Sequence, residues 1–104
     1  MRKEIEDIRE ALISIDALDE ETGAALVQLE ESIDELESHP AADKLRSVAS
    51  DTASEVHADA KGREAAVSEQ WHSLKDHVEE WEDHHPRVTL VIGKMAEALS
   101  VVGL

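Results

Sequence analysis

Residues 67–81 read VSEQWHSLKDHVEEW, and this stretch decides the fold class. Its large apolar side chains recur at steps of four, three, four and three, at Val67, Trp71, Leu74, Val78 and Trp81. This spacing places all of them on one face of an α-helix, whereas a half-buried strand would alternate at every second residue. The pattern is typical of a coiled-coil-like seam between packed helices. It predicts a helix over about residues 63–83, which ends before Pro86.

The N-terminal part carries two similar stripes. They are made of Ile5, Ile8, Leu12 and Ile15, and of Leu26, Leu29, Ile33 and Leu36. They predict helices over about 2–15 and 20–38. Asp19 fits the N-cap of the second helix, because its carboxylate can accept a hydrogen bond from an unpaired backbone N–H. The stripes keep heptad phase, so one continuous helix over 2–38 is an open alternative.

Two further helices complete the chain. Residues 41–61 keep a helical spacing of apolar residues, but these side chains are small. The last helix is predicted over 86–102, because Pro86 suits the first position of a helix and Gly103 suits the position after its end. The sequence therefore predicts an all-α fold: an antiparallel helical hairpin or bundle with coiled-coil-like seams, in a single domain over 1–104.

The last predicted helix is apolar on nearly every side, which is typical of a buried helix. Ten apolar residues lie between positions 88 and 102, more than one helix face can hide. We therefore expect this helix at the centre of the core or of an interface between copies, and the protein to be a homo-oligomer. The predicted core or interface residues are Trp71, Leu74, Val78, Trp81, Val88, Ile92, Met95 and Leu99.

The chain is strongly acidic. It has 25 acidic and 10 basic side chains, for a net charge of −15. Residues 86–104 differ from the rest, because they carry two basic groups and one acidic group. A surface of this charge repels phosphate backbones and anionic lipids, so we expect neither a nucleic-acid nor a membrane partner. Dense carboxylates with little lysine are also typical of proteins from salt-loving cells.

Several classes of chemistry have no support in the sequence. Cysteine is absent, which excludes disulfides and thiol catalysis. No nucleophile elbow, glycine-rich phosphate loop or HExxH pair is present, so we expect neither enzymatic activity nor a cofactor. The opening MRKEIE lacks the apolar core of a signal peptide, and no apolar run is long enough to span a bilayer. We therefore expect a cytoplasmic protein.

The C-terminal third contains the run WEDHHP over 81–86, then MAEALS over 95–100 and a final Gly103-Leu104. It resembles an uncharacterised family of short prokaryotic helical proteins, a domain of unknown function. Members carry an aromatic-Glu-x-x-His-Pro turn followed by an apolar Ala-Asp-Ala-Leu-Ser helix. This chain departs from that pattern with Trp81 for Phe, Glu97 for Asp and Val102 for Met. The resemblance implies a compact helical unit and no activity, and it assigns no functional residue.

Six histidines raise the alternative of a metal- or ligand-binding bundle. Both Glu69 and Glu82 stand three residues before a histidine, the spacing by which di-iron bundles place two ligands on one helix face. The candidate metal ligands are Glu69, His72, His84 and His85. If the tryptophan seam points inward, Glu69 and His72 lie beside it on outer positions, so we predict no metal site. The alternative requires His72, His77, His84 and His85 to converge with carboxylates.

The sequence thus favours a non-enzymatic acidic scaffold or protein-interaction module that acts as a homo-oligomer. The metal- or ligand-binding bundle, with the histidines and glutamates of helix 63–83, is the alternative. A third hypothesis is an acidic mimic of nucleic acid that blocks a basic protein, which would require carboxylates spaced like phosphates.

Overall fold

A computed structural model of the chain describes residues 1–57 and 67–104, and for His57 it describes the backbone alone. The described residues form helices and no strand, so the all-α prediction is confirmed. The elements are α1 (Arg2–Ser14), α2 (Glu20–Glu31), α3 (Ile33–Ser38), α4 (Ala42–His57), α5 (Val67–Val78), the 3₁₀ turn η2 (Glu79–Trp81) and α6 (Pro86–Val101).

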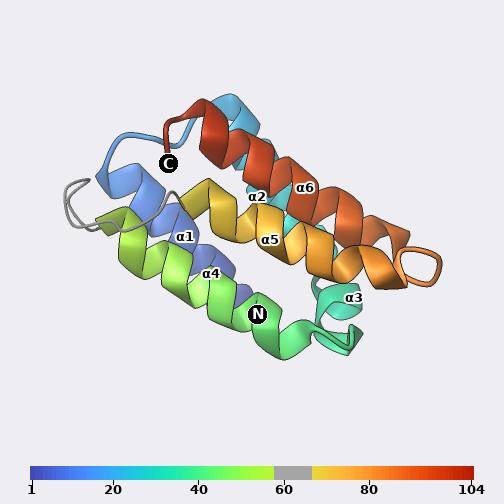
Figure 1. Ribbon diagram of the computed structural model, residues 1–104. Coiled ribbons are helices and arrows are strands. Elements are labelled where there is room, and N and C mark those ends of the chain that lie inside the picture. Colours follow the sequence, from blue (N-terminus) through green and yellow to red (C-terminus); the bar gives the residue numbers. More distant parts are fainter. Residues whose placement is uncertain (58–66) are drawn as a thin grey trace.

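The five longer helices form a ring around one core (Figure 1). In this ring α6 packs between α5 and α2, α5 packs on α4, α4 on α1, and α1 on α2. Five helices in a closed ring cannot alternate in direction throughout, so one neighbouring pair must be parallel. That pair is α1 and α4, which run the same way along the bundle (Figure 1). The antiparallel prediction therefore holds for four of the five neighbouring pairs.

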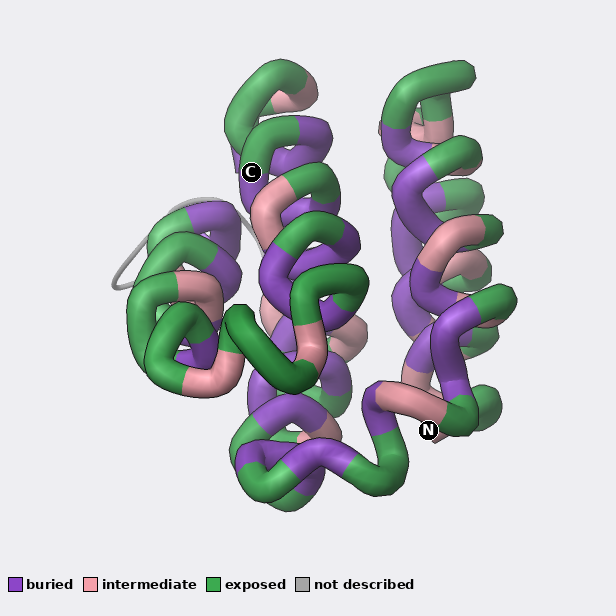
Figure 2. Tube along the Cα trace, turned by 90° about the vertical axis from the view of Figure 1, so that its right-hand side faces the viewer, coloured by how far each residue is buried: buried purple, intermediate pink, exposed green. Residues whose placement is uncertain are grey.

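Buried residues recur along every long helix with exposed residues between them, as Figure 2 shows. In α1 the residues Ile5, Ile8 and Leu12 are fully buried. Ile15, the fourth member of that stripe, is 40% exposed. The reason is that α1 ends at Ser14 and Asp16 adopts a positive φ of 56°, which turns the chain away. One continuous helix over 2–38 is thus not formed.

The helix predicted over 20–38 is interrupted at Ser32, which separates α2 from α3. Its start agrees with the sequence analysis, since the Asp19 carboxylate accepts a hydrogen bond of 2.7 Å from the Thr22 N–H. At the interruption, the Ser32 N–H is shared between the carbonyls of Gln28 and Leu29, at 3.1 and 3.2 Å. The chain tightens there by a fraction of a turn, and periodicity does not reveal so small a change.

The small apolar side chains of the next segment lie in the core of α4, where Leu45, Ala49 and Val56 are buried. Residues 58–61 of the helix predicted over 41–61 lie outside the described residues, as do 63–66 of the helix predicted over 63–83. A buried hydrogen bond of 2.7 Å from Trp71 Nε1 to Thr52 Oγ1 connects α4 to α5.

The seam of α5 faces the core, and Trp71, Leu74 and Val78 are fully buried. The α-helix ends at Val78 and not at residue 83, because Glu79–Trp81 continue as a 3₁₀ turn. That change of helical pitch rotates Trp81 away from the seam. Its ring is only half-buried and packs on the edge of the core.

The apolar surface of α6 is covered within one chain. Val88, Ile92, Met95 and Leu99 are fully buried, and the helix lies between α5 and α2. Together α5 and α2 cover more of the apolar surface of α6 than a single helix could. The number of apolar residues in α6 therefore no longer argues for an interface between copies. Among the described residues of α6, Leu90 and Val101 are the large apolar side chains left exposed.

The end of α6 has the expected glycine. Gly103 adopts a φ of 84°, and the Leu104 N–H donates to the Leu99 carbonyl at 2.9 Å. The Leu104 carbonyl accepts from the Ser68 N–H at 3.3 Å, which connects this end to the start of α5. Within the described part of the chain, none of the helices combines the length and apolarity that crossing a bilayer requires.

Candidate functional site

Two His-Pro pairs meet at one end of the bundle. His39-Pro40 lies in the turn between α3 and α4, and His85-Pro86 begins α6. The rings of His39 and His85 pack edge to face with centroids 4.7 Å apart. Trp81 packs against His39 at 5.3 Å. We call the side chains of His39, His77, Trp81 and His85 the histidine corner.

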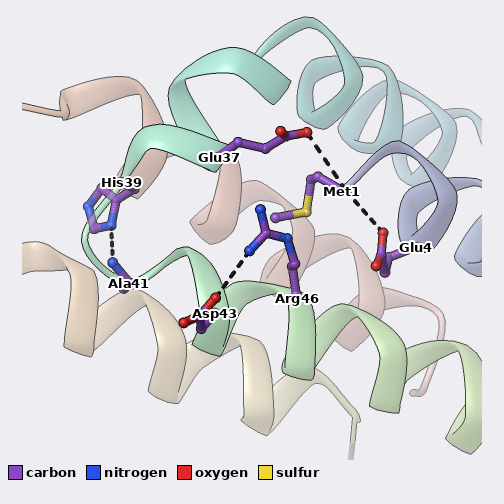
Figure 3. A network of polar contacts seen from close by, with 7 residues as sticks. All are labelled: Met1, Glu4, Glu37, His39, Ala41, Asp43 and Arg46. Atoms are coloured by element: carbon purple, nitrogen blue, oxygen red, sulfur yellow. Dashed lines mark hydrogen bonds and ion pairs between the residues drawn. The ribbon is translucent and has the colours of Figure 1, made fainter.

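His39 is the buried member of the histidine corner, at 3% exposure. Its Nδ1 accepts a hydrogen bond of 3.0 Å from the Ala41 N–H, as Figure 3 shows, so the neutral ring carries its proton on Nε2. That Nε2 is buried and has no hydrogen-bond partner among the described residues. An unpartnered donor of this kind is rare in a folded core.

The surroundings of His39 favour its neutral form. Burial lowers the pKa of His39, and the positive charge that His85 and His77 can take lowers it further. Glu35 on α3 opposes the shift. The Glu35 carboxylate lies 4.0 Å from His85 Nδ1. Protonation of His39 would also remove the acceptor that holds the Ala41 N–H.

More charges lie near the same end of the bundle. The amino group of Met1 is 3.1 Å from Glu4 Oε2 and 3.8 Å from Glu37 Oε1. Arg46 of α4 contacts Asp43 at 3.1 Å (Figure 3). The contact of Met1 with Glu37 ties the start of α1 to α3, whereas the pair of Arg46 and Asp43 lies within α4.

The four candidate metal ligands do not come together. Glu69, His72 and His84 are exposed, whereas His85 is half-buried in the histidine corner. Within residues 1–57 and 67–104, no group of three or more histidine and acidic side chains is arranged to hold a metal ion. Glu69 and His72 are exposed beside the buried Trp71 on α5.

Sequence reasoning missed His39, although a signal was present. Residues 38–40 read SHP and residues 84–86 read HHP, so the two helix breaks share a His-Pro pair. Proline excludes the preceding histidine from the α-helical region, which leaves its ring free to turn back over the break. What periodicity cannot reveal is that the two breaks lie at the same end of the bundle.

A second candidate surface is the outer face of α6, formed by the residues that recur at steps of three and four on its exposed side: Arg87, Leu90, Lys94, Glu97 and Val101. All five are exposed, and Leu90 is 57% exposed. Arg87, Lys94 and Glu97 form no ion pair with a described residue.

Open grooves lie on both sides of this outer face. On the α2 side, Gln28 and Glu31 line a groove with Arg87, Leu90 and Lys94. On the α5 side, a second groove is lined by Lys75, Glu79 and Glu82 together with Leu90 and Lys94. Lys75 of α5 is already paired, because its Nζ lies 3.7 Å from the carboxylate of Glu79 in η2. The outer face is thus a ridge between two hollows, a shape that can receive another helix.

Comparison of the chain with protein-family models, with curated proteins and with solved structures finds no match. The resemblance of the C-terminal third to a family of unknown function therefore stays a prediction.

Proposed function

We propose that this protein is a non-enzymatic, acidic helical interaction module that acts as a homo-oligomer, and that the outer face of α6 is its binding surface. The observation that supports the proposal is the combination of exposed Leu90 with the charges of Arg87, Lys94 and Glu97, which form no ion pair among the described residues. Single exposed apolar residues are common. An exposed leucine framed by unpaired charges and by two grooves is a more specific arrangement.

The charge distribution supports the same surface. With a net charge of −15, most of the molecule repels a second acidic chain. Residues 86–104 carry two basic groups and one acidic group, so α6 is where another acidic surface meets the least repulsion. The proposal includes no metal, no nucleic acid and no membrane, because the acidic surface favours neither of the last two and the four candidate metal ligands do not converge.

Sedimentation equilibrium over a range of protein concentrations tests the proposal. We expect the mass of the wild-type protein to rise above that of one chain, and Leu90→Glu to lower the association. Ile13→Glu is the matched control, since Ile13 is 58% exposed on α1, away from α6. A single-chain mass for the wild type up to millimolar concentration would contradict the proposal, as would equal association of the two variants.

A further inference from the structure

The outer face of α6 has an order of charges that can pair with itself. Along the helix the sequence is basic at Arg87, apolar at Leu90, basic at Lys94 and acidic at Glu97. When two copies of α6 run in opposite directions, a residue in the first half of one helix lies opposite a residue in the second half of the other. The register that sets Arg87 opposite Glu97 also sets Leu90 opposite Lys94, because both helices rise by the same amount per residue.

We infer that the partner of this surface is a second copy of the same chain, packed with its α6 antiparallel to the first in the register that pairs Arg87 with the second copy's Glu97. The inference rests on the proposed function. The two-fold axis creates this ion pair twice, so charges that have no ion-pair partner among the described residues of one chain receive one. Leu90 packs on the aliphatic stem of the second copy's Lys94 and leaves its ammonium group at the rim.

A parallel arrangement of two α6 helices is unfavourable. A parallel two-fold pairing sets Arg87 opposite Arg87 and Lys94 opposite Lys94, and like charges at these positions repel. In the antiparallel register, the grooves on the α2 and α5 sides lie on either side of the second helix. Their carboxylates, Glu31 on one side and Glu82 on the other, add negative charge near the basic residues of the second copy.

The chain has no cysteine, so introduced thiols report the register directly. The test variant is Arg87→Cys combined with Glu97→Cys. Within one helix the two positions are about 15 Å apart, too far for a disulfide inside one chain, whose limit is about 7 Å between Cα atoms. Mild oxidation should therefore link the double variant into a covalent dimer, while each single variant stays unlinked.

The outcomes separate the inference from the proposed function. Dimers formed by either single variant would overturn the proposed register, because position 87 or position 97 would then lie opposite itself. If the double variant itself still associates by sedimentation but forms no cross-link, the register is overturned and the proposed homo-oligomer stands. A wild type that stays a single chain would overturn both.

Charge reversal provides a second readout. We expect Arg87→Glu to weaken the association about tenfold, because two pairs become repulsive, and we expect the added change Glu97→Arg to restore it. If Glu97→Arg instead worsens the association of Arg87→Glu, the two residues do not pair and the register is wrong. Lys3→Glu with Glu6→Arg on α1 is the matched control, because residues 3 and 6 are exposed and distant from α6.

Discussion

The Nε2 donor of His39 is buried without a hydrogen-bond partner among the described residues. By contrast, the buried indole N–H of Trp71 donates to Thr52 Oγ1. The ring is held by what surrounds it: the Ala41 N–H bonds to one nitrogen, and the rings of His85 and Trp81 make edge contacts with it. Burial and the neighbouring His85 favour the neutral form of this histidine and lower its pKa.

This residue predicts a loss of stability in mild acid. The pKa of His39 is lowered in the folded state, while in the unfolded chain it stays near its ordinary value of about 6.5. As the pH falls through about 6.5, the unfolded state takes up the proton first, so the free energy of unfolding decreases until the folded pKa is reached. We expect His39→Asn, whose amide oxygen can still accept from Ala41, to lose less stability between pH 7.5 and 5.5 than the wild type.

Urea unfolding at the two pH values measures this difference. His72→Asn is the control, because it makes the same substitution at an exposed position of α5 outside the histidine corner. If His39→Asn and the wild type lose the same free energy of unfolding, the titration of His39 does not contribute.

At the scale of the helices, α4 and α5 are joined by a polar contact inside an apolar core. Thr52 Oγ1 accepts from Trp71 Nε1 and donates to the Val48 carbonyl at 2.8 Å. Thr52→Val keeps the shape of the side chain and leaves the indole N–H buried without an acceptor. We expect this to cost about 1–3 kcal/mol of unfolding free energy.

Thr89→Val on α6 is the matched comparison. Thr89 Oγ1 is buried and has no hydrogen-bond partner among the described residues, so its loss strands no other group. We expect the stability to change by less than about 0.5 kcal/mol or to rise. Thermal or urea unfolding of both variants gives the answer, and a larger loss at Thr89 than at Thr52 would contradict the hydrogen-bond assignment.

Helix periodicity predicted the elements well and their partners poorly. The stripes around Ile8, Leu29 and Trp71 gave helices that the structure contains, and the N-cap at Asp19 and the glycine at 103 are in place. The neighbours of α6 could not be read from its own residues, because a helix apolar all round fits equally well between two helices of its own chain or between two chains. Long-range topology decides between these cases.

The same reason explains what was missed at the candidate sites. Trp81 has the right phase for the seam, yet the turn from α-helix to 3₁₀ after Val78 moves it to the edge of the core. We therefore expect the change Trp71→Ala, and not Trp81→Ala, to lower the free energy of unfolding by about 3–5 kcal/mol. His39 and His85 are 46 positions apart in the sequence, and only the ring of helices brings their turns together.

For the whole molecule, repulsion among the side chains that give the net charge of −15 is the dominant long-range interaction. Self-repulsion opposes the compact state, and salt screens exposed charges beyond about 10 Å at 0.1 M. We expect the free energy of unfolding to rise between low and high NaCl, as measured by urea midpoints in each salt. NaCl should be the only salt varied, because other anions such as sulfate also change protein stability by effects other than screening. A urea midpoint that stays flat or falls with NaCl would contradict the expectation.

The parallel pair α1 and α4 also has a consequence for the order of folding. Seven residues connect α5 to α6, whereas 27 separate the end of α1 from the start of α4. As long as this stretch, which later forms α2 and α3, is unfolded, closing it costs about 1 kcal/mol more entropy than closing the α5–α6 connection. The α5–α6 hairpin should therefore be present in the folding transition state before α1 meets α4. Ile8→Val in α1 should then mainly speed unfolding, whereas Ile92→Val in α6 should mainly slow folding. Stopped-flow kinetics of the two variants measures both rates. If α1 and α4 nucleate the fold, Ile8→Val will instead slow folding and Ile92→Val will speed unfolding.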